Sequence, residues 1–454
     1  MLSELALISR RQQEAGRDMK TPEHMTWFLR DRFGMFIHWG LYALPARHEW
    51  IKNMEEMDDE RYERYFRQFD PDLYDPEEWA DRAAAAGMKY MVVTSKHHEG
   101  FCLWDSKLTD YKATNTPAGR DLLRPVLEAF RARGLKVGLY HSLIDWHHPD
   151  FLIDDVHPMR NHPDKQKLNE GRDPKRYAEY LHGQVRELLT EYGRIDVMFY
   201  DFSYPKRDEQ GKPQPWLGKG REEWESEKLL AMTRELQPGI VVNDRLDLIE
   251  AGGWDYRSPE QYVPREGVMM DGKAVPWEAC HTFSGSWGYH REEASWKSGE
   301  QLVQLLIDTV SKGGNVLLNV GPTARGEFDY RAIARLEGMG EWMKRHGRSI
   351  YGCGPAPEGF TAPQDCRLTY NAETNRVYVH VFAWPIHHLH LEGMAGKVAY
   401  AQLLNDGSEV KMIEGGPRHL AGPVEQGERS GLVTLELPIR KPEVTVPVVE
   451  VWLK

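Results

Sequence analysis

The first two-thirds of the chain alternate short apolar runs with longer segments of helical periodicity. Residues 173–193 show the clearest helical pattern, because their apolar and aromatic side chains recur every three or four positions and share one face. Further helices are expected at 76–87, 118–134 and 298–314. Buried strands are expected at 33–40, 88–98, 136–142, 194–202, 239–245 and 315–322, with weaker candidates at 254–260 and 281–289.

This alternation indicates a parallel sheet covered by helices. Eight strand candidates over about three hundred residues favour a closed barrel over an open sheet. An open dinucleotide-binding sheet would need G-x-G-x-x-G between a strand and a helix, and the glycine-rich stretch 352–359 is rich in proline and opens no helix. The sequence therefore predicts an α/β fold, a (β/α)8-like TIM barrel, over residues 1–354.

The pattern changes near residue 355. Residues 376–384, 431–438 and 444–453 alternate apolar with other side chains, turn signals such as 405–407 lie between them, and no helical pattern of useful length remains. Residues 355–454 are therefore predicted to form a C-terminal antiparallel β-sandwich domain.

Composition narrows the class of protein. The chain has 454 residues, of which 41% are hydrophobic and 28% charged, as in globular, water-soluble proteins. No apolar stretch reaches the roughly 18 residues of a membrane span, so no membrane partner is expected. The net charge of −12 argues against a nucleic-acid partner.

Two features bear on cellular location. The N-terminal apolar patch precedes basic residues, the reverse of the order in a secretory signal. The four cysteines are scattered, with no C-x-x-C pair for zinc or redox chemistry, and are read as free thiols of a reducing compartment. A cytoplasmic location is expected.

Polar side chains close most of the predicted strands. They are His38, His97, His98, His141, Asp201, Asp244, Arg245 and Glu260. Because the carboxyl ends of barrel strands meet at one mouth, these residues predict a functional site there.

Three kinds of site fit such a mouth. A metal-dependent hydrolase would need His-x-His on the first strand, which offers only His38, and adjacent His97 and His98 face opposite ways unless the chain bends. A retaining glycosidase needs two carboxyl groups about 5–5.5 Å apart, for which Asp201 suits the nucleophile and Glu260 the acid/base. A sugar-binding module without catalysis is the third alternative. The metal site is disfavoured, and neither metal nor cofactor is expected.

Eight motifs then identify a family. They are WFLRDRFGMFIHWGLYALPARHEW (27–50), SKHHEGFCLWDS (95–106), GLYHSLIDW (138–146), IDVMFYD (195–201), VVNDR (241–245), WDYRSPE (254–260), FSGSWGY (283–289) and LIDTVSKGGNVLLNVGP (306–322). In their order and spacing, the chain resembles the α-L-fucosidases of glycoside hydrolase family 29. The resemblance implies a (β/α)8-like barrel with a C-terminal β-sandwich and a retaining mechanism without metal.

The resemblance also implies roles for particular residues. Asp201 matches the family nucleophile, and Glu260 matches the acid/base of one branch, with Glu266 and Glu278 as fallback candidates. Trp287 matches an aromatic side chain near the methyl group of fucose. The positions that match contacts to the fucose hydroxyls are His38, Glu49, Trp50, His97, His98 and Arg245.

The chain departs from the family pattern at two places. His141 stands where the family often has tyrosine, and is included among the predicted substrate contacts. Phe199 and Tyr200 precede the nucleophile where tryptophan is frequent. Sugar preference is therefore less well determined by the motifs than reaction type.

The sequence thus predicts a retaining exo-α-L-fucosidase acting on terminal α-L-fucosyl linkages of oligosaccharides or glycoconjugates by double displacement. The alternatives are a glycosidase for a related sugar, such as an α-galactoside, and a sugar-binding pseudoenzyme. The linkage hydrolysed and the oligomeric state, a homo-oligomer included, stay open.

Overall fold

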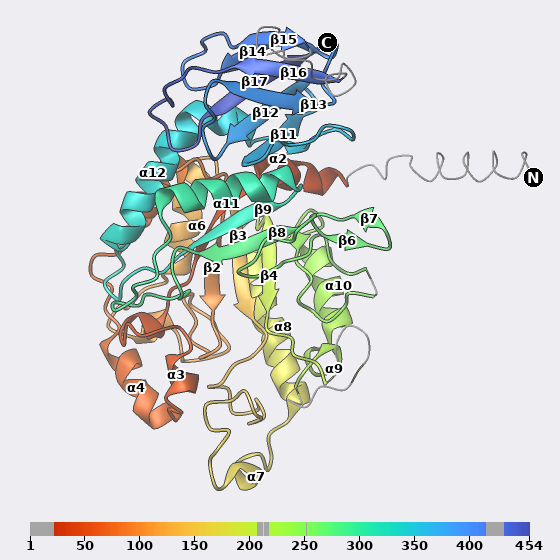
Figure 1. Ribbon diagram of the computed structural model, residues 1–454. Helices are drawn as coiled ribbons and strands as arrows, with labels where there is room; N and C mark the ends of the chain where they lie inside the picture. Colours follow the sequence, from red (N-terminus) through yellow and green to blue (C-terminus); the bar gives the residue numbers. More distant parts are fainter. Residues whose placement is uncertain (1–21, 207–211, 213–217, 251, 415–430) are drawn as a thin grey trace, which may run out of the picture.

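Seven parallel strands form the main sheet of the protein. The computed structural model describes residues 22–206, 212, 218–250, 252–414 and 431–454. The strand order is β5–β4–β3–β2–β1–β9–β8, and the sheet curls into most of a barrel (Figure 1). The strands are β1 (Phe33–Ile37), β2 (Tyr90–Lys96), β3 (Lys136–Ser142), β4 (Val197–Asp201), β5 (Val241–Val242), β8 (Glu278–Thr282) and β9 (Asn315–Val320).

The segment 254–260 fills the gap between the edge strands β5 and β8. It makes isolated parallel bridges, from Tyr256 to Asn243 on one side and from Glu260 to Cys280 on the other. It does not form the regular strand predicted there, in part because Pro259 has no N–H to donate to a ladder. The ring is therefore completed as a (β/α)8-like barrel, in agreement with the predicted fold class.

The weak strand candidate at 281–289 is mostly wrong. Strand β8 ends at Thr282, and the residues that follow form a loop. The backbone N–H groups of Trp287 and Gly288 donate to the carboxylate of Glu49 and not to a neighbouring strand. This side-chain contact fixes the loop over the barrel mouth.

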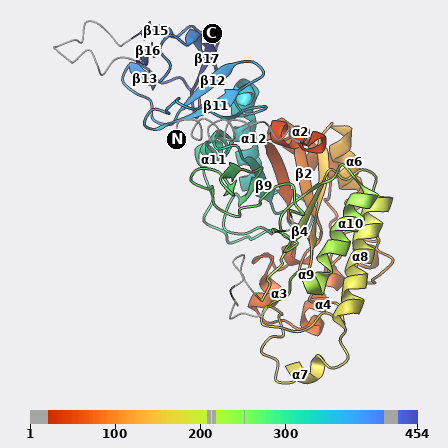
Figure 2. The same cartoon turned by 90° about the vertical axis from the view of Figure 1, so that its right-hand side faces the viewer.

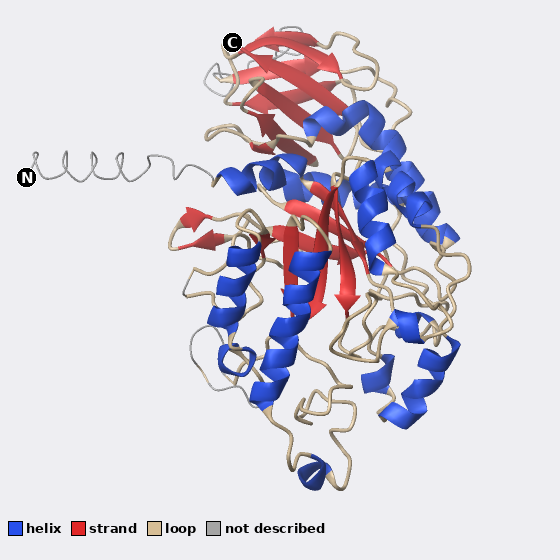
Figure 3. Ribbon diagram, turned by 180° about the vertical axis from the view of Figure 1, so that it is seen from behind, coloured by secondary structure: helices blue, strands red, loops and turns tan. Residues whose placement is uncertain are grey.

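Helices follow most of the strands and cover the outside of the sheet (Figure 2, Figure 3). The longer ones are α4 (Asp59–Gln68), α5 (Pro76–Ala85), α6 (Leu123–Ala132), α8 (Pro174–Glu191), α10 (Ser226–Leu236), α11 (Gly299–Ser311) and α12 (Tyr330–His346). The short ones are η1 (Glu23–Met25), α2 (Thr26–Asp31), η2 (Leu41–Ala43), α3 (Ile51–Met54), η3 (Ala113–Asn115), α7 (Lys165–Leu168), α9 (Arg221–Trp224) and η4 (Gly347–Ser349). None of the described helices has both the length and the apolar composition needed to cross a bilayer.

Capping side chains set several helix starts. Asp75 and Asp173 each precede a proline at the first helical position and accept backbone N–H groups of α5 and α8. Ser298 forms a capping box with Gln301 at the start of α11. The helix predicted at 118–134 begins only at Leu123.

The strands separate two apolar cores. On β4, Val197 and Phe199 belong to the core inside the barrel, while Met198 and Tyr200 belong to the core under the helices. Phe28 of α2 belongs to the same interior core. Because side chains alternate along each strand, the inward-facing side chain at the end of β4 is Asp201.

The C-terminal part consists of two antiparallel sheets. Their orders are β10–β11–β12–β17–β14 and β13–β16–β15, and a separate hairpin pairs β6 (Met269–Met270) with β7 (Lys273–Ala274). The strands are β10 (Gly354–Pro355), β11 (Cys366–Asn371), β12 (Arg376–Val381), β13 (His388–Glu392), β14 (Val398–Leu403), β15 (Lys411–Glu414), β16 (Leu432–Glu436) and β17 (Val448–Leu453). They enclose their own apolar core, as expected for a β-sandwich.

The sandwich packs on α11 and α12, at the end of the barrel opposite the strand arrowheads (Figure 1). Trp342 Nε1 donates to the carbonyl of Val446 at 2.9 Å, and Arg367 pairs with Asp308 at 2.5 Å. The sandwich therefore lies away from the barrel mouth. The predicted division between residues 354 and 355 stays a prediction, while the first strand of the sandwich begins at Gly354.

Candidate active site

A cavity of about 800 Å³ lies at the carboxyl ends of the barrel strands. Most of the side chains predicted to form a site line it. The lining includes Phe36, His38, Trp50, His97, His98, Tyr140, Phe199, Asp201, Asp244, Arg245, Glu260 and Trp287. Histidines and carboxylates thus share one cavity with several aromatic rings.

Asp201 lies at the end of β4 and is largely buried. Its Oδ1 accepts a hydrogen bond from Arg245 Nη1 at 2.6 Å, and its Oδ2 accepts one from the Tyr140 hydroxyl at 2.7 Å. Burial and the nearby carboxylate raise the pKa of Tyr140 well above its ordinary value, so the phenol remains a donor. The charged guanidinium of Arg245 and the neutral phenol of Tyr140 thus hold the Asp201 carboxylate in one orientation.

Arg245 also connects this carboxylate with the second one. Its Nη2 lies 2.8 Å from Glu260 Oε2, and the Glu260 side chain is 42% exposed at the rim of the cavity. Of the two fallback acids, Glu266 is exposed and not among the lining residues. Glu278 is buried at the start of β8, where the Tyr90 hydroxyl donates to it and burial raises its pKa to about 8. Only Glu260 of the three reaches the cavity.

The adjacent histidines both line the cavity because the chain bends. Strand β2 ends at Lys96, and the N–H of Gly100 closes a turn by donating to the carbonyl of His97. Gly100 has φ +88°, and a Cβ there would meet the Asp145 carboxylate. The two imidazole rings come to lie 4.0 Å apart between centroids.

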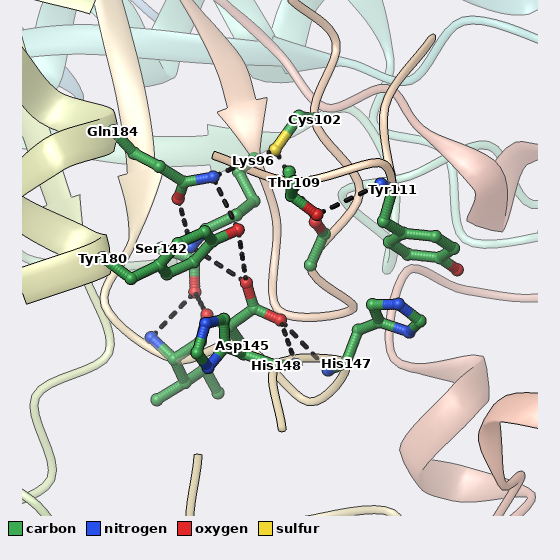
Figure 4. Close-up of polar contacts among 12 residues, drawn as sticks. Lys96, Cys102, Thr109, Tyr111, Ser142, Asp145, His147, His148, Tyr180 and Gln184 are labelled. Atoms are coloured by element: carbon green, nitrogen blue, oxygen red, sulfur yellow. Dashed lines mark hydrogen bonds and ion pairs between the residues drawn. The ribbon is translucent and has the colours of Figure 1, made fainter. Parts of the chain in front are cut away.

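A buried ionic cluster anchors this bend to helix α8 (Figure 4). Lys96 is fully buried, and its Nζ lies 3.2 Å from Asp145 Oδ2 and 2.9 Å from Gln184 Oε1. The other Asp145 oxygen accepts the backbone N–H groups of His147 and His148. The cluster ties the end of β2 to the loop that follows β3, and so supports the two histidines.

Loss of the Asp145 charge is expected to destabilise the protein strongly. Asp145→Asn leaves the Lys96 ammonium buried without a counter-charge, which should lower the free energy of unfolding by roughly 3–5 kcal/mol. The exposed pair of Lys107 and Glu191 supplies a matched control, since Glu191→Gln should change stability by less than about 1 kcal/mol. Urea unfolding of the three proteins measures both values, and equal midpoints would contradict the argument.

Two predicted substrate contacts lie elsewhere. The prediction for His141 is wrong: its ring is fully buried outside the cavity, with Nδ1 2.9 Å from Ser95 Oγ. Alternation along β3 turns Tyr140 and Ser142 inward and His141 outward, so the Tyr140 phenol and not the His141 imidazole faces the cavity. Glu49 lies outside the cavity lining, and its carboxylate holds the loop by accepting the backbone N–H groups of Trp287 and Gly288.

Some residues of the site carried little sequence signal. Tyr140, Phe36 and Phe199 line the cavity, yet in the sequence they resemble ordinary core residues of buried strands. For Phe36 and Phe199, the inward direction follows by counting back in steps of two from His38 and Asp201, which close the same strands.

One group of described residues has the spacing of metal ligands. It consists of His387, His388 and Glu436 in the C-terminal sandwich, remote from the cavity. Lys411 already pairs with Glu436 at 2.9 Å. His38, His97 and His98 do not belong to any such group among the described residues.

Comparison with known proteins relates this chain to a protein family. The model described as Alpha-L-fucosidase matches residues 2–348. Human plasma alpha-L-fucosidase is 32% identical over 389 residues, which cover 79% of this chain and 76% of the relative. The structure of alpha-L-fucosidase isoenzyme 1 from Paenibacillus thiaminolyticus is 44% identical, with a TM-score of 0.87 over 95% of this chain and 99% of that one.

A further similar structure is an alpha-L-fucosidase GH29 from Bacteroides thetaiotaomicron. It is 27% identical, with a TM-score of 0.80 over 96% of this chain and 97% of that one. It is a covalent intermediate trapped with 2-fluoro-fucosyl fluoride in a glutamate-to-glutamine mutant.

Proposed function

The chain belongs to the alpha-L-fucosidase family, and from that premise we propose that it is a retaining exo-α-L-fucosidase that hydrolyses terminal α-L-fucosyl linkages of oligosaccharides or glycoconjugates. The observation that carries the proposal is the pair of carboxylates in the cavity. Asp201 is buried and doubly hydrogen-bonded, and Glu260 lies at the rim on the other side of the same guanidinium. A double displacement needs two carboxyl groups at the scissile bond, one as the nucleophile and one as the acid/base.

In the first step, Asp201 attacks the anomeric carbon as the bond to the leaving oxygen breaks. Glu260 gives its proton to that oxygen, and a fucosyl ester of Asp201 results. In the second step, Glu260 takes a proton from water, the water oxygen attacks the anomeric carbon, and the ester bond breaks. Two inversions return the sugar with its original configuration. The covalent intermediate trapped in the Bacteroides relative supports this course.

Arg245 and Tyr140 act on the nucleophile. Both donate to the Asp201 carboxylate, so they orient its oxygens toward the cavity and hold them before attack. Arg245 is also the ion-pair partner of the Glu260 carboxylate in this arrangement. We therefore expect the leaving-group oxygen to replace the guanidinium as the partner of Glu260 when substrate binds.

The cavity walls suit a deoxysugar. His38, His97 and His98 present polar ring nitrogens for hydroxyl groups, and Trp50 packs beside His98 at 5.0 Å between centroids. On another side, Phe36 packs at 5.2 Å from Phe199 and 5.8 Å from Trp287, which makes an apolar wall. A methyl group fits such a wall, whereas a hydroxymethyl group would leave its oxygen without a partner.

A panel of aryl glycosides tests the proposal. We expect turnover of the α-L-fucoside, with α-fucose as the first product seen by proton NMR, and unchanged rates in EDTA. Faster hydrolysis of an α-D-galactoside would favour the related-sugar alternative. Binding of fucose without hydrolysis of any glycoside would favour the pseudoenzyme. Initial release of β-fucose would contradict the retaining mechanism.

A cytoplasmic location is also part of the proposal. Its support is that Cys102, Cys280, Cys353 and Cys366 are all free and buried, as expected of thiols in a reducing compartment. Fractionation of the source cells measures it, and activity in the medium or in an oxidising compartment would contradict it.

A further inference from the structure

His38 has a hydrogen-bond partner that decides which of its ring nitrogens carries the proton. The amide of Asn319 donates from Nδ2 to the carbonyl of Trp287 at 2.6 Å. The orientation of the amide is therefore determined, because the reverse would place two oxygens in contact. Asn319 Oδ1 then faces His38 Nδ1 at 2.6 Å and can only accept. The proton of neutral His38 must lie on Nδ1.

His98 is determined in the same way by Ser142. Ser142 Oγ lies 2.7 Å from the carbonyl oxygen of Ile144, and only the serine hydroxyl can place a hydrogen between these two oxygens. The serine has no second hydrogen to give, yet its Oγ lies 2.8 Å from His98 Nδ1. His98 Nδ1 must therefore be the donor, and Oγ also accepts the N–H of Ile144 at 3.2 Å. Figure 4 shows Ser142 beside the Lys96–Asp145 cluster that holds this loop.

The remaining nitrogen of each ring is available to the cavity. Both histidines line the cavity, and no hydrogen bond reaches either Nε2 from the residues that the structure describes. Burial, with the neighbouring His97 next in importance, lowers the pKa of each well below its ordinary value, so both rings are neutral near pH 7. Each Nε2 therefore carries a lone pair and no proton. That of His98 lies 4.0 Å from Asp201 Oδ2.

We propose that His38 and His98 act only as hydrogen-bond acceptors toward the substrate, each taking a hydrogen bond at Nε2 from a ring hydroxyl, and that Asn319 and Ser142 are the positioning residues that impose this polarity. The inference rests on the proposed function for the identity of the sugar, and on the protein alone for the position of the protons. It defines the ligand class as sugars whose hydroxyls can donate at these two places. A fluorine or ether oxygen there cannot satisfy either nitrogen.

The first experiment compares inhibition by free fucose with that by its 3-deoxy, 3-fluoro, 4-deoxy and 4-fluoro analogues. Fluorine cannot donate a hydrogen bond, so at a position read by His38 or His98 the fluoro sugar should bind no better than the deoxy sugar. Each should have an inhibition constant roughly 5- to 100-fold above that of fucose, because a buried acceptor loses its donor. Recovery of most of the affinity by fluorine at every position would show donor histidines and overturn the proposal.

The second experiment reads the protons directly. Nitrogen NMR of the enzyme labelled at histidine should show His38 and His98 as Nδ1–H tautomers without any ligand, with assignments taken from His38→Phe and His98→Phe. Asn319→Leu should allow His38 to adopt either tautomer, and Ser142→Ala should do the same for His98. Both substitutions should raise KM more than they lower kcat, and both should reduce the preference for fucose over its fluoro analogue. Asn319→Asp should keep the proton on His38 Nδ1.

Ser95→Ala is the matched control, since Ser95 makes the same kind of contact with His141 outside the cavity. It should alter one other histidine signal and leave the analogue preference unchanged. Nε2–H tautomers of His38 and His98 in an enzyme that hydrolyses fucosides would refute the inference while the proposed function stands. Nδ1–H tautomers in a protein that hydrolyses no fucoside would refute the proposed function while the proton positions stand.

Discussion

Replacement of Asp201 by glycine is expected to lower kcat on an aryl α-L-fucoside by on the order of 10⁴-fold or more, as loss of the nucleophile does in other enzymes with covalent intermediates. The structure supports so large an effect because, among the residues that it describes, Asp201 is the carboxylate that accepts both the Arg245 guanidinium and the Tyr140 hydroxyl. Glu260 lies at the rim, on the far side of Arg245. Initial rates at saturating substrate measure the loss, and a variant that retained wild-type rates would disprove the role of Asp201.

Azide distinguishes a lost nucleophile from a damaged fold. The small anion can enter the space left by the carboxylate and attack the anomeric carbon once, so Asp201→Gly in azide should yield β-fucosyl azide. The matched control is Asp196→Asn, directly before the first residue of the same strand, where the carboxylate accepts the N–H of Val137 and lies outside the cavity lining. This control should keep its activity and show no response to azide. An equal loss in both variants would point to damage of β4.

Replacement of Glu260 by alanine should have an effect that depends on the leaving group. A natural saccharide leaves as a poorly stabilised alkoxide and needs the proton, so its hydrolysis should fall by roughly 10²–10⁴-fold. An aryl fucoside with an acidic phenol needs little protonation of its leaving group in the first step. The fall in its hydrolysis rate should therefore reflect only the second step. Azide should restore turnover and yield α-fucosyl azide, because the Asp201 ester still forms. Rates across a series of phenols measure this dependence.

Glu266→Ala supplies the control, since this carboxylate belongs to the same loop but is exposed and outside the cavity lining. It should behave as the wild-type enzyme with every leaving group. A steeper dependence on the leaving group in Glu266→Ala than in Glu260→Ala would transfer the acid/base role to Glu266.

Local signals were sufficient for most helices and strands. The Asp-Pro pairs at 75–76 and 173–174 place two helix starts because capping and the fixed φ of proline act within a few residues. The segment 254–260 was recognised as strand-like, and it does lie between β5 and β8. Its irregularity depends on both neighbouring strands, which no local pattern describes.

The site also combines residues that local sequence signals identify with residues that only the neighbouring strands place. The sequence predicts six site residues because each lies at the end of a predicted strand, and the structure brings all of them to one cavity: His38, His97, His98, Asp201, Arg245 and Glu260. The exchange of Tyr140 for His141 shows the limit of this reasoning. Both are polar or aromatic at the end of the same strand, and only the register of β3 against its neighbours decides which one faces inward.

The sequence by itself determined the alternation of strands and helices, the identity of the family and the two carboxylates at the strand ends, because these depend on local periodicity and on motifs that are contiguous in the chain. The tertiary structure alone decided the pairing of Lys96 with Asp145, the placement of Glu49 behind Trp287 and the hydrogen-bond partners of His38 Nδ1 and His98 Nδ1. Each of these joins residues from separate segments, and a hydrogen bond is determined only when both of its partners have been placed in space.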